Sequence, residues 1–119
     1  MITAERILLG YDFYRRRHDD APPAHIPALR AALVFARELA RSEADQPAAL
    51  LFAFAVQRHT FGPAWAFMAK SIAIQEAHAL GWALALEDGD KLVRAYLWRM
   101  SVAPFEDVRA FVAARLRPL

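Results

Sequence analysis

Hydrophobic side chains recur along most of the chain at the three- and four-residue spacing of α-helices. Near the start, Thr3 has the character of a helix cap, and the helical spacing then lasts until a polar, proline-containing break at residues 18–23. A second amphipathic stripe covers residues 29–39 and follows Pro27, which suits the first turn of a helix. The pattern therefore predicts two peripheral helices. The apolar stripe of the first comprises Ile7, Leu8, Tyr11 and Tyr14.

The middle of the chain contains two segments with unusually few polar residues. Residues 48–56 have no polar side chain, and residues 64–80 form a second, mostly apolar segment that Pro63 can open and Gly81 can end. Helices that are apolar on every side are typically enclosed by others. The pattern therefore predicts an inner pair of helices that meet at a short turn around His59.

The spacing of hydrophobic residues is less regular in the C-terminal third of the chain. Residues 82–86 alternate poorly and predict an extended connector, which could pass for a strand, before a turn at 87–90. Residues 92–100 predict a fifth helix, and Pro104 then opens a sixth. The expected inner face of the sixth helix comprises Phe105, Val108, Phe111, Val112 and Leu116.

Composition agrees with a helical domain. The chain has 119 residues, of which 57% are hydrophobic, and this length is enough for one domain with a core of its own. We therefore expect a single all-α domain over residues 1–119, folded as a compact bundle of about six helices.

Charge and cysteine content exclude several classes of protein. Basic and acidic residues number 15 and 13, so the formal charge is only +2 and a nucleic-acid partner is not expected. There is no cysteine, which excludes disulfides and thiol catalysis and fits a reducing, cytoplasmic location. The start of the chain lacks the pattern of a signal peptide, and the longest apolar run, residues 47–56, is about half of a membrane span. No membrane attachment is expected.

The four histidines do not predict a metal site. None has a second histidine at helical spacing, so neither a metal nor a cofactor is expected. His18, His25 and His78 have the character of surface or packed residues. His59 differs because it lies at the turn between the two inner helices, where it could contribute to an anion site or simply cap the preceding helix.

The segment 48–61 resembles the helix and His-x-Phe entry of the Fic and death-on-curing (Doc) proteins, with His59 and Phe61 at the two motif positions. The family motif runs His-x-Phe-x-acid-Gly-Asn-Gly/Lys-Arg. Residues 81–84 are similar to the glycine-aromatic step that follows the next helix in that family, and residues 90–108 and 2–8 resemble the closing helices and the opening of its small death-on-curing type. The resemblance implies a Fic/Doc-like helical fold.

The rest of the motif departs from the family. Pro63 stands at the acid and Ala64 at the glycine, while Trp65, Ala66 and Phe67 stand at the asparagine, the glycine or lysine, and the arginine. In the family, the histidine is the general base, the acid holds magnesium, and the turn with its arginine holds the nucleotide phosphates. Transfer of a phosphate group depends on neutralising its charge, and each ~1.4 kcal/mol lost is tenfold in rate. The resemblance therefore implies an inactive site, in which Trp65, Phe67 and Met68 fill the core.

Three hypotheses of function follow. The leading one is a catalytically inactive Fic/Doc-like domain, a pseudoenzyme of bacterial or phage toxin–antitoxin origin, that acts by binding another protein. The alternatives are a residual AMP- or phosphoryl-transferase toxin that uses His59, and an unrelated small helical inhibitor or adaptor of a protein or ribonucleoprotein. Arginines are frequent interface anchors. The candidates are Arg15, Arg16, Arg17, Arg94 and Arg99.

Overall fold

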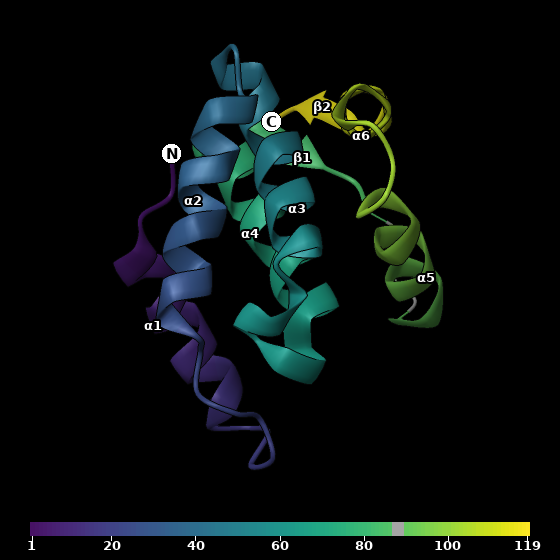
Figure 1. Cartoon of the computed structure of the whole chain (residues 1–119). Coiled ribbons are helices and arrows are strands. Elements are labelled where there is room, and N and C mark those ends of the chain that lie inside the picture. Colours follow the sequence, from purple (N-terminus) through teal and green to yellow (C-terminus); the bar gives the residue numbers. More distant parts are fainter. Residues whose placement is uncertain (87–89) are drawn as a thin grey trace.

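Six α-helices and a two-stranded antiparallel sheet make up the part of the chain that the computed structural model describes, residues 1–86 and 90–119, with the backbone alone at 90–94 (Figure 1). The mostly helical fold with six helices is the one expected from the hydrophobic pattern. No helix within the described ranges is both long enough and apolar enough to cross a membrane. The helices are α1 (Ala4–Arg15), α2 (Ile26–Leu39), α3 (Gln46–Val56), α4 (Trp65–Ala79), α5 (Asp90–Met100) and α6 (Phe105–Ala113), and the strands are β1 (Trp82–Leu84) and β2 (Leu116–Pro118).

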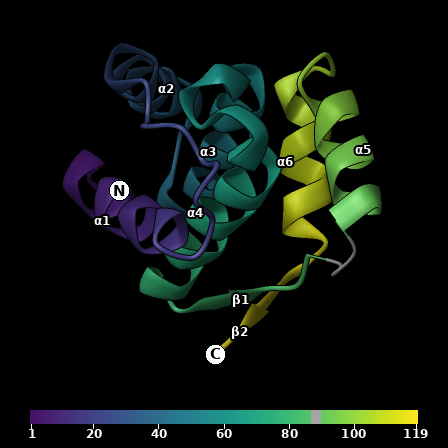
Figure 2. The same ribbon diagram turned by 90° about the horizontal axis from the view of Figure 1, so that it is seen from below.

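The predicted inner pair, α3 and α4, lies at the centre of the molecule. In α3 every residue from Pro47 to Ala55 is buried, and Trp65, Met68 and Ile72 of α4 are buried in the same core. Helices α1 and α2 cover one side of this pair, and α5 and α6 cover the other (Figure 2). The apolar character of residues 48–56 and 64–80 thus identified the centre of the core.

Helix starts largely follow their sequence signals. The Thr3 hydroxyl accepts a hydrogen bond of 3.3 Å from the N–H of Arg6 and caps α1. Pro27 lies in the first turn of α2. Pro63 lies in the 3₁₀ turn Gly62–Ala64 just before α4, which begins at Trp65. Proline thus introduces α4 without belonging to it.

The C-terminal segment corrects one expectation. Leu116 was expected on the inner face of the sixth helix, but α6 ends at Ala113 and Leu116 begins strand β2. This strand pairs with β1, with Leu84 opposite Leu116 and Trp82 opposite Pro118. The connector after α4 is therefore a strand, because a distant segment supplies the hydrogen-bond partners that neither strand has alone. The turn predicted at 87–90 lies largely outside the described residues.

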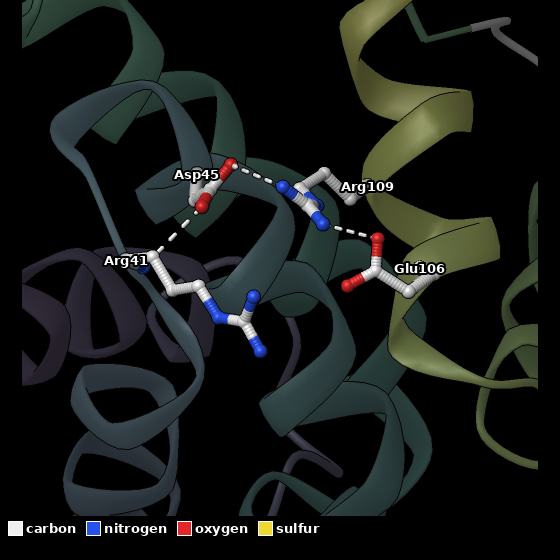
Figure 3. A network of polar contacts seen from close by, with 4 residues as sticks. All are labelled: Arg41, Asp45, Glu106 and Arg109. Atoms are coloured by element: carbon white, nitrogen blue, oxygen red, sulfur yellow. Dashed lines mark hydrogen bonds and ion pairs between the residues drawn. The ribbon is translucent and has the colours of Figure 1, made fainter.

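An ionic network attaches α6 to the connection between α2 and α3 (Figure 3). The Asp45 carboxylate, which is only 8% exposed as a residue, accepts a hydrogen bond of 3.3 Å from the N–H of Arg41. Its other oxygen lies 3.8 Å from the Arg109 guanidinium, which also pairs with Glu106. This network compensates the burial of the Asp45 charge, since a buried carboxylate needs partners.

Candidate functional site

A groove of about 870 Å³ lies between α1 and α4. The two helices run in opposite directions, because the N–H of Ile2 binds the Glu76 carboxylate near one end and Tyr14 contacts Phe67 near the other. Each wall is one face of a helix at three- and four-residue spacing. The wall on the α1 side includes Arg6, Leu9, Gly10, Phe13 and Arg17, and the α4 wall includes Phe67, Ser71 and Gln75.

Three large apolar side chains in this groove remain exposed. Leu9 is 71% exposed, Phe13 is 56% exposed and Phe67 is 47% exposed. Single exposed apolar residues are ordinary on protein surfaces, but several that line one concavity indicate a binding surface. The groove is therefore the candidate functional site.

The groove is also basic. Arg6 lines it near the start of α1, and Arg16 and Arg17 line it at the end of that helix. Lys70 contributes a further cation from α4, and Asp12 is the one acidic residue lining the groove within the described part of the chain. Basic residues thus lie at both ends of a groove whose walls carry exposed apolar side chains.

The aromatic rings near the C-terminal end of α1 already contact other side chains of the groove. The Tyr14 ring lies 3.9 Å from the His18 ring and parallel to it, and 5.0 Å from the ring of Phe67. The Arg17 guanidinium lies over the Phe13 ring at 4.5 Å from its centroid. These contacts hold the side chains in place, while Phe13 and Phe67 still expose about half of their surface.

The buried Tyr11 connects α1 to the turn before α4. Its hydroxyl donates its one hydrogen to the carbonyl oxygen of Pro22, at 2.5 Å, and the carbonyl oxygen of Phe61 lies 3.3 Å from the same hydroxyl. Burial raises the pKa of Tyr11 above its ordinary value. Gly62 lies in the same turn with a φ of +57°, and a Cβ there would come within 3.0 Å of the Pro22 ring. This close approach and the positive φ explain the glycine.

His59 lies outside the groove, in the 3₁₀ turn Arg58–Thr60 that follows α3, and is exposed. Its ring lies 5.4 Å from the ring of His25, the N-cap residue of α2. The backbone N–H of His25 donates to Thr60 at 2.8 Å, and its Nδ1 accepts from Ala28 at 3.2 Å. These two hydrogen bonds fix His25 at the start of α2, beside the turn that contains His59.

The other motif positions lie mostly in the core. Phe61 is 1% exposed and packs between Tyr11 and Phe54, with ring centroids 4.9 and 5.7 Å away. Ala64, Trp65 and Ala66 are buried, as is Met68. The prediction that Phe67 fills the core was wrong, because it is half-exposed in the groove. Among the described residues, no cluster of three or more histidine or acidic side chains could hold a metal ion.

The predicted arginine candidates do not form one surface. Arg16 and Arg17 line the groove, whereas the half-buried Arg15 donates its Nε hydrogen to the carbonyl of Ala21. Arg99 lies on α5, across the inner pair from α1, with its guanidinium 5.7 Å from the Tyr96 ring centroid (Figure 2). The side chain of Arg94 lies outside the described residues.

Sequence reasoning missed Leu9, Gly10 and Phe13. Leu9 and Phe13 are spaced by four residues, off the stripe of Ile7 and Tyr11 that packs into the core. A second apolar stripe on one amphipathic helix is the signal that would have found this wall of the groove.

Comparison with family models, with curated proteins and with solved structures finds no match for this chain. The fold and the candidate site define the class of protein: a mostly helical domain with a groove between two antiparallel helices. The groove exposes apolar side chains and has basic residues at its ends. The Fic/Doc resemblance stays a prediction.

Proposed function

We propose that this chain is a protein-binding helical domain without catalytic activity, and that the α1–α4 groove is its binding surface. The observation that carries the proposal is the exposure of Leu9, Phe13 and Phe67 along one concave surface. Full burial of a large apolar side chain is worth about 1.5–3 kcal/mol, so covering these three contributes substantially against the cost of association. A protein partner can cover all three at once.

The surroundings of His59 support a binding function over catalysis. Where the Fic/Doc motif has its phosphate-binding turn, Ala64, Trp65 and Ala66 pack into the core. Trp65 also lies beside Arg58 and Trp98, with the two indole centroids 6.2 Å apart. Groups buried in this way do not present charge to a nucleotide, and transfer chemistry depends on such charge.

We also propose that the chain is an inactive domain of Fic/Doc type with a toxin–antitoxin origin. The support is the position of His59 and Phe61 in the turn between the two inner helices, the place that the motif has in that family.

A selection experiment with matched variants tests the binding function. A displayed library of random 16-residue peptides is selected on the wild-type protein, and the enriched peptides are tested on Gly10→Ala and Gly10→Trp. A Cβ at Gly10 meets nothing within 4 Å, and both residues have higher helix propensity than glycine, so both variants should fold. We expect peptides that bind the wild type and Gly10→Ala but not Gly10→Trp, whose indole fills the groove.

Two outcomes would contradict the proposal. One is a failure to enrich any peptide. The other is a set of peptides that bind all three proteins equally, since they would use some other surface. Thermal unfolding of each variant is the control for folding.

A further inference from the structure

Resting on the proposed function, we propose that the occupant of the groove is an acidic amphipathic α-helix of a partner protein. Its apolar stripe would lie in the groove against Leu9, Phe13 and Phe67. Carboxylates near its two ends would pair with Arg6 at one end of the groove and with Arg16 and Arg17 at the other.

The shape of the groove favours a helix. Both walls are helical, and their backbone groups are used within α1 and α4, so the groove offers no strand edge to which an extended peptide could add. Arg6 and Arg16, the C-cap residue of α1, are ten positions apart, a separation of roughly 15 Å along a helix axis, or about three turns. A partner helix of this length presents anchors at i, i+4 and i+7.

Gly10 leaves the middle of the groove open. It lies in the middle of α1 between the exposed Leu9 and Phe13, in ordinary helical conformation, and has open space where a side chain would be. Glycine inside a helix lowers helix stability relative to alanine. Because a Cβ at Gly10 would meet nothing within 4 Å, this open space leaves room for a partner side chain even beside a methyl group, but not beside an indole.

Charge determines which partner fits. With basic residues at both ends and Asp12 as the one acid among the described lining residues, the groove complements an acidic segment. A second copy of this chain that used the same surface would place Arg16 and Arg17 against their own counterparts or against Arg6. Repulsion of like charges disfavours such a dimer.

The aromatic contacts disfavour single-stranded nucleic acid. Binding of unpaired bases relies on free aromatic faces beside basic residues. Here His18 stacks on Tyr14, and the Arg17 guanidinium covers one face of Phe13. These two rings therefore offer fewer free faces on which unpaired bases could stack, and the basic residues lie beside apolar side chains instead.

The peptides selected in the previous experiment test this inference directly. Those lost on Gly10→Trp should carry net negative charge, show apolar residues at helical spacing, and gain helical circular dichroism on binding. The best of them, labelled with fluorescein, should bind at least tenfold more weakly to the Arg16→Glu/Arg17→Glu double variant, and also more weakly at 500 mM than at 50 mM salt. Arg99→Glu, on the far side of the inner pair, should leave the affinity unchanged.

The failures of the two proposals are distinguishable. Groove-dependent peptides that are neutral, basic or proline-rich would overturn the acidic helix and leave the binding function intact. The absence of groove-dependent peptides would overturn both. A labelled 15-nucleotide oligouridine that binds the wild type but not Gly10→Trp would replace the protein partner by RNA. Sedimentation showing a dimer that Gly10→Trp dissociates would replace it by a second copy.

Discussion

The carboxylate of Glu76, buried in the C-terminal half of α4, accepts a hydrogen bond of 2.7 Å from the backbone N–H of Ile2. This bond joins the segment before α1 to α4. Together with the contact of Tyr14 and Phe67 near the opposite end, it holds the two walls of the groove in register.

Loss of this acceptor should destabilise the fold. Glu76→Ala leaves the N–H of Ile2 without its acceptor in a buried site, so we expect the free energy of unfolding in urea to fall by about 1–3 kcal/mol. Glu76→Gln keeps a carbonyl oxygen at the same position and should lose distinctly less. Equal losses for the two variants would show that the hydrogen bond is not what stabilises this contact.

A matched pair of phenylalanines separates stability from binding. Phe52 is 9% exposed and lies between Phe35 and Phe105, with ring centroids 5.8 and 5.9 Å away. Phe52→Ala should therefore cost about 3–5 kcal/mol of unfolding free energy. Phe13→Ala removes a half-exposed ring and should cost less than about 1 kcal/mol, while it weakens the binding of groove-dependent peptides. Similar stability losses would contradict the assignment of Phe13 to a binding surface.

Tyr11 should make the fold sensitive to alkaline pH. Burial raises its pKa above the ordinary 10.0 and outweighs the opposing effect of the Arg15 cation. Because the folded state holds the phenol proton more tightly than the unfolded state, this contribution is complete below about pH 10 and is lost as the pH rises through the folded-state pKa. Urea unfolding from pH 8 to 11 should show a steeper decline for the wild type than for Tyr11→Phe. Parallel curves would exclude this contribution.

His59 should be dispensable for function. His59→Ala removes an exposed ring outside the groove, so we expect unchanged peptide affinity and a stability change within about 0.5 kcal/mol. A general base contributes about 10²–10⁴ to a rate, so an active transferase would lose most of its activity in this variant. Incubation with labelled ATP or GTP and magnesium should label no protein above the His59→Ala background. Labelling that depends on His59 would support the transferase hypothesis instead.

The local pattern of the sequence determined the helices and their layering. Periodicity placed α1, α2 and the inner pair, because a helix that is apolar on one stripe or on all sides must bury that surface. The turn around His59 followed from the same reasoning, and Thr3 caps α1 as its side chain predicts. These features depend on residues within a few positions of one another.

The tertiary structure decided the features that depend on distant segments. Strand β2 forms because β1, more than thirty positions earlier, supplies its hydrogen-bond partners, and this overrides the helical spacing that had placed Leu116 in α6. His25 and His59 meet through the bond of the α2 cap to Thr60. The groove exists because α1 lies beside α4 in one orientation, which places Phe13 and Phe67 along the same concavity. Helical spacing shows which residues share a face of one helix, but the packing of two helices decides which faces meet and which remain open to a partner.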